Sequence, residues 1–495
     1  MTDTRHYQMY INGELVDSES GKWTQSICPG DGEVVGEFPE ANGQDVEKAV
    51  AAAKLAFEST DWSDVRNSVN RSKFLREIGQ KIRERVDALA ELESLDTGKT
   101  ITETNLVDVH SAADCFEYFA DLATNICGEV LPVPMEALDF TLREPLGVCA
   151  SIVAWNFPIM FVAWKVAPAL AAGNTVVLKP AELASLSALE VSKIFQEVNL
   201  PPGVVNVVTG MGRTVGEALA KNTEVSKISF TGSTQTGQKI LSYAASNCKK
   251  VTLELGGKSP NVVFDDAELD KAVSGALTAI FFNAGQACIA GSRLFLQEGI
   301  YDAFVEQLVE RARKIKVGLP LDWDARMGPV ITPEQQKKIL HYIEGAKKQG
   351  AKLLCGGGAP KNLPHPKGNY VEPTIFECKD LALTIAKEEI FGPVLSVFKF
   401  STEEEAVSLA NQTNYGLASG VWTKDIKRAL RVAKKIRAGQ VWINNYELIS
   451  PWAPHGGYKE SGFGKDLSKY ALEEYTQIKN VFVDLSEGEF LTLYD

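Results

Sequence analysis

The chain has 495 residues, more than one hydrophobic core normally organises, so about two or three domains are expected. Hydrophobic residues make up 45% and charged residues 23%, the balance of a soluble globular protein, and no run of about 18 uncharged apolar residues predicts a membrane span. The net charge of −13 argues against a nucleic-acid partner.

The N-terminal segment and the cysteines both indicate a reducing compartment. Residues 1–18 are polar throughout and contain no apolar stretch before a small-residue cleavage site, so we expect no secretory signal and a cytoplasmic protein. The eight cysteines are scattered, with no CxxC pair and no Cys/His group at zinc spacing. We therefore expect free thiols and no metal site.

Residues 1–140 are predicted to be mainly helical because apolar residues recur at three- and four-residue spacing. The expected helices there are 44–58, 68–96 and 101–125. From residue 147 onward, short β-branched runs alternate with helical segments. The expected strands are 148–153, 175–178, 204–208 and 228–230, and the helices between and after them are 158–172, 183–197, 213–220 and 234–245. This alternation predicts a doubly wound, parallel nucleotide-binding sheet.

A second α/β series is predicted after residue 257. It includes strands 261–264 and 394–399 and a helix at 335–349. The tail contains a β-branched strand signal at 477–483 with no partner nearby in sequence. We expect that strand to pair at a distance or across subunits.

Two turns after predicted strands are candidates for cofactor binding. The segment FTGST places Gly232 and Ser233 between a strand and a helix, where backbone N–H groups suit a phosphate. The spacing fits neither the Gly-x-Gly-x-x-Gly fingerprint nor a Walker loop, so an ordinary strand-to-helix turn remains an alternative. Lys179 and Glu182 follow the strand 175–178 and suit ribose hydroxyls, although their spacing alone favours a solvated turn.

Three residues are candidates for covalent catalysis. Cys288 follows a small, flexible stretch, and a nucleophilic cysteine needs local help because its ordinary pKa is about 8.5. Glu254 lies among leucines and glycines, a setting that raises a carboxyl pKa on burial and suits a general base. The Asn156 amide suits an oxyanion donor. The alternatives are an inert buried thiol, an ion-paired glutamate and a helix-cap asparagine.

Seven segments occur in one order along the chain. They are WNFP (155–158), KPAE (179–182), FTGST (230–234), LELGGKSP (253–260), GQAC (285–288), EEIFGPV (388–394) and GGYKESGFG (456–464). Together they resemble the NAD(P)-dependent aldehyde dehydrogenase superfamily, over nearly the whole chain. The resemblance implies an α/β fold with a Rossmann-type NAD-binding domain, an α/β catalytic domain and a small oligomerisation arm.

The resemblance also implies roles for single residues. It makes Cys288 the nucleophile, Glu254 the base that activates water, and the Asn156 amide with the Cys288 backbone N–H the oxyanion hole. The implied cofactor contacts, with no metal among them, are Trp155, Lys179, Glu182, Gly232, Ser233, Glu389 and Phe391. The Glu182 carboxylate would repel a 2′-phosphate, so NAD is expected over NADP. A base at Glu254 favours hydrolysis of the thioester over its transfer to coenzyme A.

The substrate is less defined by the resemblance. Phe157, Trp164, Phe282 and His455 match positions that line the substrate tunnel of relatives, and such a tunnel suits an apolar or a cationic aldehyde. The chain resembles betaine aldehyde dehydrogenases and is somewhat similar to aminoaldehyde dehydrogenases, yet the aromatic cage before Gly456 is incomplete. Core packing is the alternative for each tunnel residue. Asp466 stands where many relatives carry a glutamate, which leaves a proton-relay role for it open.

The expected domain limits follow from the same resemblance. They are 1–122 with 144–254 for the NAD-binding domain, 255–455 for the catalytic domain, and 123–143 with 474–495 for the oligomerisation segment. A homo-oligomer is expected, a dimer or a tetramer, with a small aldehyde as the other partner. Two rival functions remain: a catalytically silent NAD-binding or structural protein, and an esterase that uses the same thiol without NAD.

Overall fold

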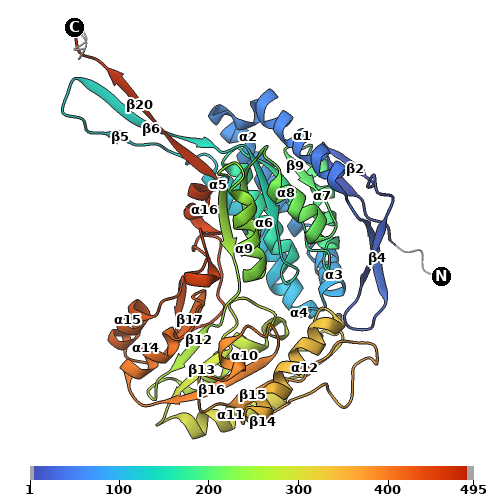
Figure 1. Cartoon of the computed structure of the whole chain (residues 1–495), viewed down its shortest axis with the longest axis vertical. Helices are drawn as coiled ribbons and strands as arrows, with labels where there is room; N and C mark the ends of the chain where they lie inside the picture. The colour runs from blue at the N-terminus through green and yellow to red at the C-terminus, as the bar shows by residue number, and fades with distance from the viewer. Residues whose placement is uncertain (1–4, 488–495) are drawn as a thin grey trace.

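The computed structural model describes residues 5–487 and contains two large β-sheets, each covered by helices, and a thin arm (Figure 1). The first sheet has eight strands in the order β19-β11-β10-β7-β8-β9-β1-β2. Its strands are β1 (Met9–Ile11), β2 (Glu14–Val16), β7 (Val148–Ile152), β8 (Thr175–Lys179), β9 (Val205–Val207), β10 (Val225–Thr231), β11 (Lys250–Glu254) and β19 (Gly462–Phe463). The five central strands run parallel, as the sequence pattern predicts.

Helices cover both faces of this sheet. They are α1 (Gly43–Ser59), α2 (Ser68–Arg83), α3 (Val86–Thr97), α4 (Ile101–Glu103), η3 (Thr104–Asp108), α5 (Val109–Leu122), α6 (Pro158–Ala171), α7 (Leu186–Glu197), η4 (Gly212–Gly216), α8 (Glu217–Lys221) and α9 (Thr234–Ala244). Every residue of α6 is buried, because its sequence is apolar on all sides except at Lys165, and only a position between other elements hides such a helix. Within residues 5–487, no helix is long and apolar enough to cross a membrane.

The prediction for residues 1–140 is wrong in two places. Four short strands, β1 and β2 with β3 (Trp23–Ile27) and β4 (Val34–Pro39), precede the first helix. The predicted helix 68–96 is two helices, separated at Arg85, whose backbone is not helical (φ −125°, ψ 20°). Arg83 pairs with Glu117 on α5 and Arg85 with Glu197 on α7, so tertiary ion pairs favour a change of direction that apolar periodicity does not reveal.

The second sheet has seven strands in the order β14-β15-β16-β13-β12-β17-β18. Its strands are β12 (Pro260–Val263), β13 (Arg293–Gln297), β14 (Lys352–Cys355), β15 (Thr374–Glu377), β16 (Val394–Phe400), β17 (Ala418–Trp422) and β18 (Gln440–Ile443). Its helices are α10 (Leu269–Phe281), α11 (Tyr301–Arg313), α12 (Pro333–Lys348), α13 (Thr384–Lys387), α14 (Glu403–Asn411) and α15 (Ile426–Lys435). All strands but β14 run parallel, which confirms the predicted second α/β series.

A three-stranded arm projects from the body of the molecule (Figure 1). It consists of β5 (Val130–Leu131), β6 (Ala137–Pro145) and β20 (Thr476–Asp484), and the last helix, α16 (Ser468–Glu474), leads into it. The predicted tail strand has a distant partner in its own chain, since β20 pairs antiparallel with β6 from Thr476 opposite Pro145 to Asp484 opposite Ala137. Residues 488–495 of the predicted oligomerisation segment lie outside the described residues.

Candidate active site

Cys288 lies where two cavities meet. One is a cleft of about 200 Å³ against the first sheet, and the other is a tunnel of about 300 Å³ that reaches the surface near Val107 and Leu448. Cys288 is the one residue that lines both. All eight cysteines are free thiols, and none of the other seven lines either cavity. A molecule in the cleft and a molecule in the tunnel would therefore both reach this sulfur.

The loop before Cys288 is held in an unusual backbone shape. Asn283 and Ala284 both adopt left-handed conformations, with φ of 50° and 51°. The Asn283 backbone N–H donates to the buried Glu103 carboxylate at 2.6 Å, and the Gln286 side chain accepts from the Ile331 N–H at 2.9 Å. Strained backbone of this kind persists only where its surroundings fix it, and it is concentrated at functional sites.

Two glycines allow neighbouring backbone to approach this loop. A Cβ added at Gly257 would lie 2.1 Å from the Cys288 carbonyl oxygen, and one added at Gly285 would lie 2.2 Å from the carbonyl oxygen of Gly392. Neither contact involves a side chain that could move aside. Any side chain at Gly257 of LELGGKSP or Gly285 of GQAC would clash with backbone. Glycine at these positions lets the Cys288 loop pack closely against its neighbours.

Burial and nearby carboxylates raise the pKa of the Cys288 thiol, with Glu254 and Glu389 as the charged neighbours. The resting thiol is therefore protonated at neutral pH. Because the thiolate is the reactive form, addition to a substrate requires a group that removes this proton.

Glu254 ends strand β11 and faces the cleft. Burial raises the pKa of its carboxyl well above the ordinary value, and the Asp466 charge adds to this, whereas Lys165 and Lys465 oppose it. The Oε2 atom is buried without a hydrogen-bond partner in the described part of the chain, and the Nε2 atom of His455 lies 3.8 Å from it. A carboxyl group with a raised pKa, and so with more affinity for a proton than an ordinary glutamate, thus lines the cleft with the thiol.

Asn156 is buried immediately after β7, in the turn that leads into α6. The Asn156 side-chain amide donates to the Gln286 backbone carbonyl oxygen at 2.9 Å. The Asn156 backbone carbonyl accepts from the Asn283 side-chain amide at 3.0 Å. The amide therefore lies against the Cys288 loop and lines the cleft with the sulfur.

The cleft collects most of the residues predicted to bind a cofactor. Ser233 caps α9, and its hydroxyl accepts from the Thr236 N–H, so the N–H groups at the start of an eleven-residue helix face this region. The Trp155 and Phe391 rings meet edge to face at 5.2 Å. The predicted residues that line the cleft are Trp155, Asn156, Gly232, Ser233, Glu254, Cys288, Glu389 and Phe391.

Glu389 is fixed at the cleft wall by backbone. Its Oε1 atom accepts from the Gly257 N–H at 2.9 Å, and a Cβ at Gly256 would lie 2.4 Å from Oε2. Sequence reasoning missed two other cleft residues, Gln335 and Lys338, which come from the first turns of α12. Their helix was predicted, but nothing local in the sequence relates it to the distant β7 and β11.

Lys179 and Glu182 lie at the end of β8, next to the cleft and not in its wall. Lys179 is buried, and its ammonium group donates to the Pro180 carbonyl at 2.8 Å and to the Glu182 carboxylate at 3.2 Å. The second Glu182 oxygen accepts from the Gly212 N–H at 3.4 Å. The two charges thus form one polar group at the carboxyl edge of the parallel sheet.

The tunnel is walled mostly by aromatic and apolar side chains. Phe157 and Phe282 stack at 6.0 Å, and Trp164 meets the ring of His455 at 5.1 Å, so all four predicted tunnel residues line it. Burial lowers the pKa of His455 to about 4, so its ring is neutral. Sequence reasoning missed Met160 and Phe161 on α6 and the segment 445–449, although that segment follows a parallel strand, where sites commonly form.

Asp466 forms a buried ion pair with Lys165 from the middle of α6. Its backbone also exchanges two hydrogen bonds of 2.8 Å with His455. Asp466 therefore affects the pKa of Glu254 through its charge. The buried Lys165–Asp466 ion pair also joins the chain after the GGYKESGFG segment to helix α6.

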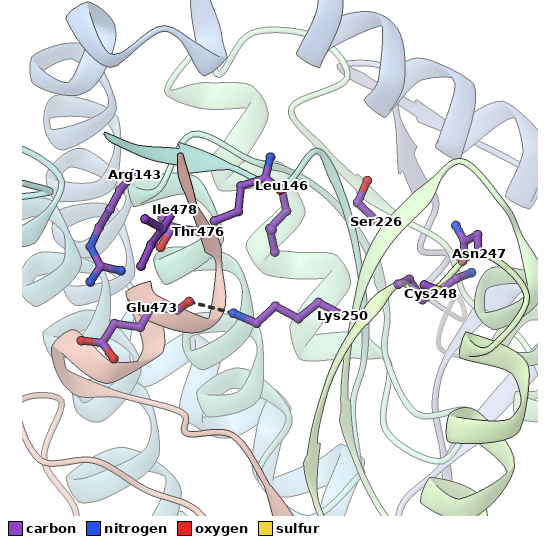
Figure 2. A pocket seen from close by; sticks show the side chains of 11 residues that line it. Arg143, Leu146, Ser226, Asn247, Cys248, Lys250, Glu473, Thr476 and Ile478 are labelled. Atoms are coloured by element: carbon purple, nitrogen blue, oxygen red, sulfur yellow. Dashed lines mark hydrogen bonds between the residues drawn. The ribbon is translucent and has the colours of Figure 1, made fainter. Parts of the chain in front are cut away.

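A larger hollow of about 700 Å³ lies at the base of the arm, away from Cys288 (Figure 2). Figure 2 shows Lys250 extended toward Glu473, whose backbone carbonyl accepts from the Lys250 ammonium at 2.8 Å. None of the predicted site residues lines this hollow. Size alone therefore does not identify the site, and the predicted catalytic and tunnel residues line the cleft and the tunnel instead.

Comparison with known proteins gives a consistent result. The model of the aldehyde dehydrogenase family matches residues 15–481. The chain is 46% identical to the betaine aldehyde dehydrogenase of Bacillus subtilis over 96% of both chains, and 47% identical to an aldehyde dehydrogenase of Emericella nidulans over 97% of this chain and 96% of that one. An NAD+ complex of a Bacillus cereus aldehyde dehydrogenase matches with a TM-score of 0.95 and 42% identity over 97% of each chain. With the fold and the spacing of its motifs in agreement, the chain belongs to the aldehyde dehydrogenase family.

Proposed function

We propose that this protein oxidises an aldehyde to the carboxylic acid with NAD+ through a covalent intermediate on Cys288. The observation that carries the proposal is the position of this thiol, the one residue shared by a cleft suited to a nucleotide and a tunnel suited to an organic substrate. Family membership and the identity to named aldehyde dehydrogenases support the reaction class.

The residues around the thiol suggest how the first bond forms. Glu254 lines the same cleft as the Cys288 sulfur, and its charge raises the pKa of the thiol, so it is the group that would take the thiol proton, directly or through a water, as the sulfur adds to the aldehyde carbon. The adduct is a thiohemiacetal whose oxygen carries negative charge. The Asn156 amide would turn from the Gln286 carbonyl to this oxygen, together with the Cys288 backbone N–H, because an oxyanion is the stronger acceptor.

The cleft has the donors that a dinucleotide needs. The N-terminus of α9 with Ser233 suits the pyrophosphate, and Lys179 with Glu182 suits ribose hydroxyls. Glu182 would repel a 2′-phosphate, so we propose NAD rather than NADP. Glu389, Trp155 and Phe391 would hold the nicotinamide half beside the sulfur. A bound nicotinamide supplies hydride acceptance, which converts the thiohemiacetal to a thioester.

Release of the product would depend on Glu254. Once it has passed the thiol proton to solvent, Glu254 would be a carboxylate again and would take a proton from water as that water adds to the thioester carbon. The C–S bond then breaks, and the departing sulfur takes the proton from Glu254. The product is a free carboxylate and a regenerated thiol. A buried carboxyl with a raised pKa suits this step because its carboxylate form is a stronger base than an ordinary glutamate.

We also propose a role for each part of the chain. Residues 1–122 and 144–254 would bind NAD, residues 255–455 would contribute the thiol and the tunnel, and residues 123–143 with 474–495 would join subunits into a dimer or tetramer. The projecting arm of β5, β6 and β20 supports the last point, since its half-exposed strands carry Leu138, Leu142, Ile478 and Phe482 at the surface.

The test follows NADH absorbance with purified protein, NAD+ and a panel of aliphatic, aromatic, amino- and trimethylammonium aldehydes. Cys288→Ala should abolish NADH formation and retain NAD+ binding, whereas Cys248→Ala, which removes an exposed thiol away from both cavities, should leave the rate unchanged. Absence of NADH with every aldehyde, with NAD+ still bound, would favour the silent binding protein. Ester hydrolysis without any NADH formation would favour the esterase.

A further inference from the structure

Glu103 is a buried carboxylate whose two oxygens have different partners. The Oε2 atom accepts hydrogen bonds of 2.9 Å from both the backbone N–H and the hydroxyl of Thr100, and so completes the capping box of the short helix α4. The Oε1 atom accepts from the Asn283 backbone N–H at 2.6 Å, 180 residues further along the chain. One carboxylate thus joins α4 to the loop that precedes Cys288.

The bond from Glu103 holds a turn that needs outside support. Asn283 and Ala284 are both left-handed, and such a backbone persists only where its neighbours fix it. Asn283 is 3% exposed, so water cannot readily take the place of Glu103 as the acceptor. All three bonds to Glu103 come from donors, and a hydrogen bond to an ionised acceptor is stronger than one to a neutral acceptor.

This turn contacts both parts of the proposed oxyanion hole. The Asn283 side-chain amide donates to the Asn156 backbone carbonyl at 3.0 Å and to the Gln286 carbonyl at 3.3 Å. The same Gln286 carbonyl accepts from the Asn156 side-chain amide at 2.9 Å. The Cys288 backbone N–H lies two residues after Gln286. Glu103 is therefore connected through Asn283 to both donors.

We propose that Glu103 is a positioning residue that holds the Asn156 amide and the Cys288 N–H at the spacing an oxyanion requires. This inference rests on the proposed function and deepens it, because it adds a residue that lines neither cavity. A misplacement of about 1 Å can cost about 100-fold in rate. Loss of the bond should therefore slow the reaction although every group that contacts a ligand is still present.

Two reactions of the Cys288 sulfur separate positioning from general damage. Acylation by 4-nitrophenyl acetate passes through a tetrahedral oxyanion, whereas alkylation by iodoacetamide displaces iodide and forms no oxyanion. Glu103→Leu removes both acceptor oxygens, so it should lower the acylation rate and the kcat of aldehyde oxidation by about 30- to 100-fold. The alkylation rate and the KM for NAD+ should change by less than about twofold. Mass spectrometry of the modified peptide checks that Cys288 is the residue that reacts.

Two further variants control for the helix cap and for charge. Thr100→Val removes the hydroxyl from the cap of α4 and leaves the bond to Asn283, so acylation should stay within about twofold of native. Glu103→Gln keeps one acceptor oxygen for the Asn283 N–H, and the Thr100 hydroxyl can accept from the new amide. Its acylation rate should be about 3- to 10-fold below native, clearly above that of Glu103→Leu. If Glu103→Leu does not fold, the selective loss of acylation over alkylation in Glu103→Gln carries the test.

The outcomes that would overturn the proposal are distinct. Equal loss of acylation and alkylation would mean that access to the sulfur is damaged, and a slow Thr100→Val would assign the effect to the cap of α4. Equal loss in the Gln and Leu variants would point to charge alone. Because the ester needs no NAD+, a native protein that is acylated but forms no NADH would refute the proposed oxidation and still test Glu103. A native protein that is alkylated but never acylated would refute this inference.

Discussion

The cleft and the tunnel that meet at Cys288 are built in different ways. The cleft is formed largely by turns at the ends of β7, β10 and β11, in which Gly232 and Gly256 let the backbone itself form the wall. The tunnel is walled by side chains from η3, α5, α6, α10 and the segment after β18.

This contrast has a physical consequence for sequence and for substitution. A wall made of backbone requires glycine at fixed positions, so it leaves short contiguous motifs and tolerates little change. A wall made of side chains tolerates exchange as long as volume and charge fit, so it leaves no motif. We therefore expect changes in the cleft to affect every aldehyde alike and changes in the tunnel to reorder the aldehydes.

The largest effect is expected from Glu254→Gln. Loss of the base should lower steady-state turnover by about 100- to 10,000-fold for all aldehydes. Because the pKa of Glu254 is raised, the native rate should fall as pH decreases through that raised pKa, and the variant should lose this dependence. Stopped-flow NADH absorbance and a pH profile of kcat check both points. A variant that keeps the native pH limb would show that another group is the base.

Asn156→Ala should rank second. Removal of one oxyanion donor commonly costs about 100- to 1000-fold in kcat, and the loss should be similar for short and bulky aldehydes. Equilibrium binding of NAD+ should stay close to the native value, which serves as the internal control. A loss confined to bulky aldehydes would instead mean that Asn156 shapes the tunnel.

Trp164→Ala should have a smaller and selective effect. The ring packs against His455 and Phe161 in the tunnel wall, so its removal should raise KM for small aldehydes by about tenfold and leave KM for NAD+ unchanged. Steady-state kinetics with a size series of aldehydes checks this expectation. Trp323→Ala, an exposed tryptophan outside both cavities, is the matched control. Equal loss for all sizes would contradict the expected selectivity.

Ser233→Ala should have the smallest effect of the four. It removes the cap of α9, a change worth about 1 kcal/mol, and with it one hydroxyl from the cleft. We expect KM for NAD+ to rise by less than about tenfold at constant aldehyde ranking. Differential scanning fluorimetry should show a small decrease in Tm. A change in aldehyde ranking would mean that the two cavities are coupled more closely than their walls suggest.

Much of the architecture follows from the sequence because its elements are strongly patterned. The central strands β7 and β8 are wholly buried and β-branched, and α6 is apolar throughout, so both leave clear signals. The strands β1 to β4 are short, and β2 to β4 are partly exposed. The end of α2 carries no Gly or Pro, so local patterns reveal neither these strands nor the break after α2.

The predicted site residues show the same difference between positions that local patterns reveal and positions that they do not. Motif residues such as Ser233, Glu254 and Glu389 lie together in the cleft, because each follows a strand or turn of fixed geometry. Met160, Phe161 and the segment 445–449 left no local signal, since they line the tunnel only in the folded chain. The Lys165–Asp466 pair likewise joins residues far apart in sequence, and only the folded chain shows that they neutralise each other.

The position of Cys288 between two cavities with separate entrances also affects the order in which the two ligands bind and leave. Exposed Lys338 borders the cleft, and exposed Val107 and Leu448 border the tunnel, so each cavity has its own entrance. Neither ligand needs to leave before the other arrives, and both can be resident while the sulfur holds the acyl group. We therefore expect intersecting rather than parallel lines in double-reciprocal kinetics, the pattern that a ternary complex produces.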